Sequence, residues 1–173
     1  MCGFGGIVLP GDGLVDADAL RRMATTIQHR GPDGTHVATP PGIGLVHCRL
    51  AVIDLSARAD QPFARPDLDG LLAFNGEIYN FRELRRDRER EGTAFGTESD
   101  SEVLLATLVR HGPEALAGLR GMFALALWRP GERRLLLARL GERQKHRLRC
   151  LPFAGHVTRP HHRDDPRRLR HTL

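Results

Sequence analysis

The sequence predicts an α+β fold in which β-sheets pack on each other and helices cover their outer faces. Residues 121–128 (GMFALALW) are apolar at successive positions, so the strand expected there needs cover on both faces. Helices are predicted as well, for example from apolar residues spaced i, i+3, i+4 and i+7 at Leu20, Met23, Ala24 and Ile27. A layered sandwich of sheets and helices satisfies both observations.

The N-terminal part of the chain predicts a strand followed by a helix. Residues 3–9 (GFGGIVL) form the expected strand, which ends at the Pro- and Gly-rich turn 10–13. The helix begins near Asp16 or Asp18, because either carboxylate can accept a hydrogen bond from a backbone N–H of the first turn. The segment 29–34 (HRGPDG) contains Gly and Pro and therefore ends the helix.

Further strands are predicted from short apolar runs between turn residues. They lie at 43–46 (IGLV), at 50–55 (LAVIDL) and at 71–74 (LLAF), which leads into Asn75-Gly76. A last run at 134–138 (RLLLA) is expected to pair with the strand at 121–128 across the turn Pro130-Gly131.

Two more helices are expected, at roughly 81–91 and 100–111. Each is preceded by a residue that can accept from the first turn, with a Glu three positions later, which is the pattern of a capping box. The two pairs are Asn80 with Glu83 and Ser99 with Glu102.

Length and composition predict one catalytic domain in the cytoplasm. The chain has 173 residues, of which 40% are hydrophobic, and this is enough for one sizeable core. No apolar run approaches the ~18 to 20 residues of a membrane span. The start MCGFGGIVLPGDG lacks the basic region and long apolar stretch of a secretory signal.

The three cysteines do not predict a disulfide framework or a metal site. Cys2, Cys48 and Cys150 are odd in number and irregularly spaced, which fits neither paired disulfides nor a C-x-x-C zinc site. Cys48 follows the apolar run 43–46 and is expected to be a small buried core residue. No metal site is predicted.

The end of the chain differs from the rest in charge and pattern. Residues 139–173 carry ten Lys or Arg and three Asp or Glu, so they account for the net charge of +5. Residues 140–173 have no strand or helix periodicity and mix Arg and His with Pro, which is typical of a disordered or non-native segment. We therefore divide the chain into a domain at 1–139 and an irregular basic tail at 140–173. Neither nucleic acid nor membrane is expected as a partner.

Cys2 is the candidate nucleophile. Removal of Met1 would leave one residue that carries both a thiol and a free α-amino group. An α-amine titrates near ~7.7 to 8.0 and a cysteine thiol near ~8.5, so the amine can accept the thiol proton without a histidine. The alternative is an ordinary cysteine at the second position.

Asn75 and Gly76 are the candidate oxyanion hole. A nucleophile that attacks an amide needs hydrogen-bond donors for the oxyanion that develops. Asn75 offers a side-chain amide, and Gly76 offers a backbone N–H that no Cβ obstructs. The alternative is that the pair is a plain Asn-Gly hairpin turn.

Arg49 and Asp100 are candidates for binding an amino acid. A free amino acid is a zwitterion, so its site needs a cation for the carboxylate and an anion for the ammonium group. Arg49 lies inside an apolar stretch, where an unpaired charge is costly, and Asp100 lies in the first turn of an expected helix. For Asp100 the alternative is a simple partner of the helix dipole.

Seven segments of the chain, in order, resemble asparagine synthetase, a class II glutamine amidotransferase. They are MCG at 1–3, HRGPDG at 29–34, RLAVIDLS at 49–56, Gln61-Pro62, FNGEIYNFRELR at 74–85, ESDSEVLL at 98–105 and LRGMFALALW at 119–128. The resemblance covers about residues 1–139. The residues GEIYN after Asn75 are similar to the asparagine synthetase branch of this class.

The resemblance implies an N-terminal-nucleophile hydrolase fold, which is a four-layer αββα sandwich of antiparallel sheets. It implies that a Cys2 thioester hydrolyses L-glutamine to glutamate and ammonia without a cofactor. Glutamine hydrolysis would be one half of a ligase in amino-acid biosynthesis, whose ATP and Mg belong to a separate synthetase domain or subunit. The implied roles are nucleophile for Cys2, oxyanion hole for Asn75 and Gly76, and glutamine binding for Arg49, Glu77, Asp100 and, through its backbone, Val52.

After Arg139 the sequence departs from the family. The pattern Asp-Arg-x-Gly-x-Lys-Pro-Leu-Tyr and the ATP-binding synthetase domain, both expected next, do not follow. We expect a shift of reading frame near residues 139–145; the alternative is a genuine stand-alone glutaminase with a basic tail. A further alternative for the chain is a non-catalytic truncated relic or interaction fragment.

Overall fold

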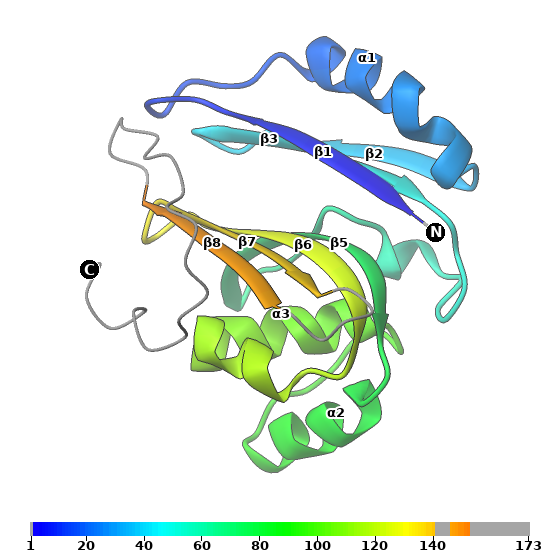
Figure 1. The fold of residues 1–173 in the computed structure, drawn as a ribbon, viewed down its shortest axis with the longest axis vertical. Coiled ribbons are helices and arrows are strands. Elements are labelled where there is room, and N and C mark those ends of the chain that lie inside the picture. The colour runs from blue at the N-terminus through cyan, green and yellow to red at the C-terminus, as the bar shows by residue number, and fades with distance from the viewer. Residues whose placement is uncertain (1, 141–145, 153–173) are drawn as a thin grey trace.

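Two antiparallel sheets face each other in the computed structural model, which describes residues 2–140 and 146–152. Helix α1 (Ala17–Ile27) covers the outside of one sheet, and helices α2 (Phe81–Arg90) and α3 (Asp100–His111) lie outside the other (Figure 1). The described residues therefore form a four-layer αββα sandwich, as expected.

The first sheet has three strands in the order β1 (Gly3–Val8), β3 (Ile43–Arg49) and β2 (Gly34–Ala38). Helix α1 packs on it around a small apolar cluster that includes the buried Cys48. The predicted cap is present, because the side chain of Asp16 accepts a hydrogen bond from the backbone N–H of Asp18 at 2.9 Å.

The second sheet has five strands. Their order is β4 (Phe63–Arg65), β5 (Leu68–Ile78), β6 (Gly121–Arg129), β7 (Arg134–Leu140) and β8 (His146–Pro152). In the described residues, three short 3₁₀ helices connect the elements, namely η1 (Gln28–Arg30), η2 (Ala57–Ala59) and η3 (Pro113–Gly118).

Strand β6 contributes to two cores, which explains why its sequence is apolar on both faces. Phe123, Leu125 and Leu127 pack in the cluster between the second sheet and its helices. Ala126 and Trp128 pack in the cluster between the two sheets. The predicted pairing of β6 with β7 is confirmed.

Two sequence expectations about strands are wrong. Residues 50–55 form a loop, and Val52 and Leu55 are exposed there. The pair Asn75-Gly76 lies inside β5, which continues to Ile78 because it keeps its pairing with β6 to that point.

The capping boxes are also wrong in detail, although the helices begin at the expected residues. The Asn80 side chain makes no cap; it donates to Gly118 O and accepts from Arg120 N. Ser99 does cap α3, but Glu102 accepts from backbone N–H groups of residues 96 and 97 instead of closing the box.

The segment expected to be irregular contains a strand. Residues 146–152 form β8, which pairs antiparallel with β7, because the open edge of β7 offers backbone hydrogen bonds to any extended segment. Residues 141–145 and 153–173, and with them most of the expected tail, lie outside the described residues. Within the described part of the chain, no helix is long and apolar enough to cross a membrane.

Candidate functional site

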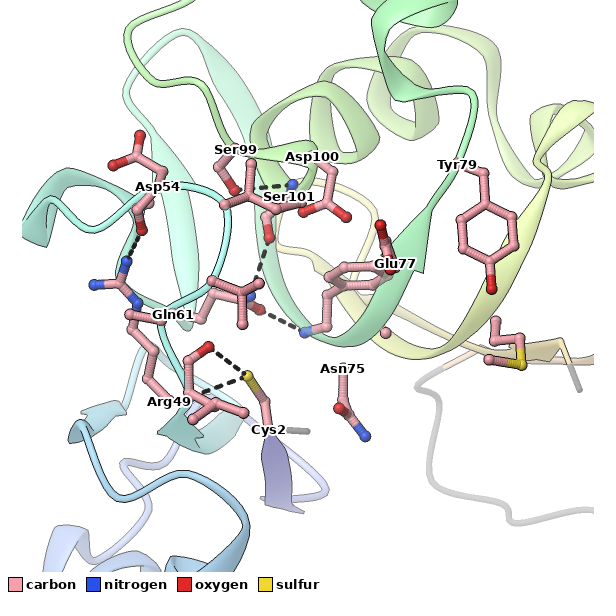
Figure 2. A pocket seen from close by; sticks show the side chains of 18 residues that line it. Cys2, Arg49, Asp54, Gln61, Asn75, Glu77, Tyr79, Ser99, Asp100 and Ser101 are labelled. Carbon is pink, nitrogen blue, oxygen red and sulfur yellow. Dashed lines mark hydrogen bonds between the residues drawn. The ribbon is translucent and has the colours of Figure 1, made fainter.

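One cavity lies between the edges of the two sheets and the start of α3. Figure 2 shows that its walls come from the start of β1, the loop after β3, strand β5 and the N-terminus of α3. All seven residues selected from the sequence line it: Cys2, Arg49, Val52, Asn75, Gly76, Glu77 and Asp100. Residues far apart in the chain thus meet at one site.

Cys2 lies just before β1 and is partly exposed. Its Sγ accepts a hydrogen bond from Leu50 N at 3.2 Å and lies 3.5 Å from Leu50 O, to which the thiol can donate. The Cys2 carbonyl accepts from Nε of Arg30 at 3.1 Å. The loop after β3 therefore fixes the position of the sulfur.

Asn75 and Gly76 lie on β5, in the opposite sheet. Gly76 has φ +149° and lies so close to β6 that a Cβ would be 2.1 Å from Met122 O, so only glycine fits. The Asn75 Oδ1 atom is buried and accepts no hydrogen bond from any described residue. The unpaired Oδ1 is an acceptor, so the atom of this side chain that suits an oxyanion is the Nδ2 donor of the same amide, and Asn75 lines the cavity.

Arg49 ends β3 and is held by the loop that follows. It forms an ion pair with Asp60 and donates to the backbone carbonyls of Asp54 and, at 3.0 Å, Ser56. The guanidinium is thus buried but paired, as a charge in an apolar setting must be. The nearby Val52 is 74% exposed, and it lines the mouth of the cavity.

Asp100 and Glu77 are two of the three acidic residues that line the cavity, and the third is Asp54. Asp100 is 6% exposed, and its Oδ2 accepts from the backbone N–H of Ile78 at 3.2 Å. Burial raises the pKa of Asp100 to about 6, and the negative charge of Glu77 adds to this rise, while the Ile78 hydrogen bond opposes it. Two carboxylates in one cavity create a site for a cation.

Further polar residues line the cavity that were given no role in the site from the sequence, and three of them are Gln61, Ser101 and Asp54. Gln61 and Ser101 hydrogen-bond to each other, and Asp54 accepts from the backbone of Glu98 at the start of α3. All three lie within the motifs noted in the sequence. Their side chains form hydrogen bonds to residues far away in the chain, and the spacing of a motif does not indicate such partners. Among the described residues, no group of three His, Cys, Asp or Glu could hold a metal ion.

Comparison with known proteins identifies the domain. Residues 1–143 match the model of the glutamine amidotransferase domain family. Asparagine synthetase [glutamine-hydrolyzing] 1 of Bacillus subtilis is 39% identical over 142 residues, which cover 80% of this chain and 22% of that protein. Asparagine synthetase B of Escherichia coli is 39% identical over 132 residues, which cover 74% and 23%.

A search of solved structures finds glutamine phosphoribosylpyrophosphate amidotransferase of Bacillus subtilis, with 24% identity and a TM-score of 0.47 over 58% of this chain and 24% of that one. This chain spans less than a quarter of the asparagine synthetases it matches. The family match itself covers most of the 173 residues. The chain therefore belongs to the glutamine amidotransferase domain family and is similar to the corresponding part of asparagine synthetases.

Proposed function

We propose that this chain hydrolyses L-glutamine to L-glutamate and ammonia through a thioester on Cys2. The observation that carries the proposal is that one cavity is lined by a thiol, the amides of Asn75 and Gly76 on β5, one arginine and three carboxylates. Nucleophile, oxyanion donors and a charge pattern for a zwitterion are what this reaction needs.

The nucleophile is expected to become active when Met1 is removed. The α-amino group of Cys2 then takes the thiol proton, because α-amines and cysteine thiols in model peptides have pKa values within about one unit of each other. The Leu50 N–H that already donates to Sγ would stabilise the thiolate. No histidine lines the cavity among the described residues.

The reaction proceeds in two steps. The thiolate attacks the side-chain amide carbon of glutamine, and Asn75 Nδ2 and Gly76 N–H donate to the oxyanion. The C–N bond breaks, the nitrogen takes the proton held by the α-amine, and ammonia leaves the γ-glutamyl thioester. A water molecule then attacks the thioester, the C–S bond breaks, and glutamate and the free thiol result.

Charge recognition selects the substrate. We assign the α-carboxylate of glutamine to Arg49 and its ammonium group to Glu77 and Asp100, with a backbone contact from Val52. Arg49 already binds Asp60, so glutamine must use the remaining N–H groups or displace part of this pairing. Asp100 is ionised above its pKa of about 6 and then attracts the ammonium group.

Glutamine hydrolysis as proposed uses no cofactor or metal. ATP and Mg belong to a separate synthetase domain or subunit, which we propose as the partner that receives the ammonia and transfers it to an activated carboxylate. The proposal places the reaction in the cytoplasm, where a free thiol stays reduced. Residues 1–139 are the unit proposed to carry the chemistry.

The test is glutamate release by purified protein from which Met1 has been removed, compared with Cys2→Ala. The wild type should turn over glutamine and the variant should not. A glutamine-analogue electrophile, 6-diazo-5-oxo-L-norleucine, should add one label to wild type, and mass spectrometry should locate it on Cys2. A folded, processed wild type that neither releases glutamate nor takes up the label would refute the proposal.

A further inference from the structure

Gln61 connects two walls of the cavity. Its side chain is 7% exposed, and both of its polar atoms are bound. Oε1 accepts from the backbone N–H of Phe74 on β5 at 2.6 Å, and Nε2 donates to Ser101 Oγ on α3 at 3.0 Å (Figure 2). Phe74 precedes Asn75, and Ser101 follows Asp100, so Gln61 joins the proposed oxyanion donors to the proposed ammonium site.

The sheet register explains why a side chain fills this place. Strand β4 pairs with β5 at Phe63 and Leu72, and the same antiparallel register two residues further places Gln61 opposite Phe74. The pairing of β4 has ended there, so the Gln61 amide supplies the hydrogen bond that a strand backbone would supply. The Phe74 carbonyl is held as well, by Nε2–H of the buried His47 at 3.1 Å.

A second hydrogen bond fixes the other end of the same segment. The Ile78 N–H donates to Asp100 Oδ2. Residues 75–77, which contain the proposed oxyanion donors, therefore lie between two points at which β5 is tied to the start of α3. Asp100, which accepts from Ile78, also has a proposed contact with glutamine. Gln61, which accepts from Phe74, has no such proposed contact.

We propose that Gln61 is a positioning residue for glutamine hydrolysis, which holds Phe74 so that Asn75 and Gly76 donate at the oxyanion. This inference rests on the proposed function. A donor that shifts away from the oxyanion costs transition-state stabilisation and leaves ground-state binding nearly unchanged. Gln61 therefore affects kcat, whereas Arg49, Glu77 and Asp100 are expected to affect KM.

Gln61→Met is the main variant, because Met has a similar length and neither donates nor accepts strongly. We expect kcat for glutamate release to fall about tenfold to hundredfold, with KM within about threefold of wild type. Ser101→Ala is the second variant; it leaves Gln61 bound only to Phe74, and we expect a kcat loss of about threefold to tenfold. Val109→Ala is the matched control, because Val109 packs on the core from the same helix as Ser101 but does not line the cavity, and its kcat should equal that of wild type.

Each outcome decides the inference. An unchanged kcat in Gln61→Met, or a raised KM alone, overturns it; if this variant does not fold, an unchanged kcat in Ser101→Ala overturns it. A wild type without turnover refutes the proposed function instead. In that case amide hydrogen exchange at Phe74 still tests the anchor: faster exchange in the variant than in wild type and Val109→Ala supports it, and equal exchange overturns it.

Discussion

The two walls of the cavity are built differently. The strand wall, residues 74–78 of β5, is fixed by its pairing with β6 and by buried hydrogen bonds to Gln61 and Asp100. The loop wall, residues 50–60, is held by polar contacts of Arg49, Asp54 and other side chains, while Val52 and Leu55 are exposed. The donors proposed for the oxyanion thus lie on a paired strand together with Glu77, whereas the proposed carboxylate binder Arg49 is held by a loop.

Gly76→Ala tests how closely the strand wall packs against β6. Gly76→Ala should lower the free energy of unfolding by at least about 3 kcal/mol and abolish glutamate release, because the Cβ meets Met122 O and φ is +149°. Urea unfolding and the glutaminase assay measure both effects. Gly92→Ala is the control: φ is +90°, yet no atom lies within 4 Å of the Cβ, so its cost should be only about 1 to 2 kcal/mol with activity kept. Equal costs would disprove the packing argument.

Arg49→Met tests the charge that holds the loop wall. The variant removes the Arg49 partner of Asp60, which keeps its contact with His36, and removes one of the two donors to Ser56 O, which still accepts from Ala59 N–H. We expect KM for glutamine to rise about tenfold or more and stability to fall by about 1 to 3 kcal/mol. Asp60→Asn separates the two effects, since it removes the ion pair and keeps Arg49. A KM that does not change in Arg49→Met would exclude a carboxylate-binding role.

Asp100→Asn tests the charge beside the strand wall. The folded-state pKa of about 6 exceeds the usual 3.8, so the carboxyl stabilises the fold in its protonated form below pH 3.8, and this contribution is lost as pH rises through 6. The variant should therefore be more stable than wild type at pH 7, by about 2 to 3 kcal/mol, and the difference should vanish near pH 3.8.

The pH dependence of substrate binding should be opposite to that of stability, because stability favours protonated Asp100 and glutamine binding favours ionised Asp100. Because the ionised Asp100 attracts the ammonium group, KM should fall as pH rises through about 6, and Asp100→Asn should lack this change. Chemical denaturation and kinetics between pH 4 and 8 measure the two trends. A variant less stable than wild type at pH 7 would show that the Ile78 hydrogen bond outweighs the burial of the charge.

Asp54→Ala should give the smallest effect. Asp54 joins the loop wall to α3 through Glu98 N at 3.0 Å and accepts from Ser56 N at 2.8 Å, but it lies near the surface. Such a residue is expected to contribute about 0.5 to 1 kcal/mol to stability, and its loss should raise KM about twofold to fivefold with little change in kcat. A larger loss in kcat than in KM would mean that the loop also positions the nucleophile.

The sequence predicted the sandwich because β6 is apolar at successive positions and because the helices carry clear apolar spacing. It missed β2 and β4, which are short and become strands only because neighbouring strands pair with them. It also placed a strand at 50–55, where a polar network around Arg49 holds an apolar run in a loop. Local patterns carry no information about such partners.

The chemical groups of the site were easier to predict than the hydrogen bonds that hold them in place. Thiol, amide, guanidinium and carboxylate groups are visible as residue types, and all of the selected residues line the cavity. The roles of Gln61 and Ser101 depend on where β4 ends relative to β5, and only the folded register reveals this.

The position of strand β6 between two cores determines how the domain unfolds. Since its two faces belong to different cores, neither layer of the sandwich can lose its packing without exposing the other. Unfolding should therefore be a single cooperative event, without an intermediate that keeps one half of the cavity. Trp128, the only tryptophan in the chain, is buried on β6, so its fluorescence and the reactivity of Cys2 should report the same transition.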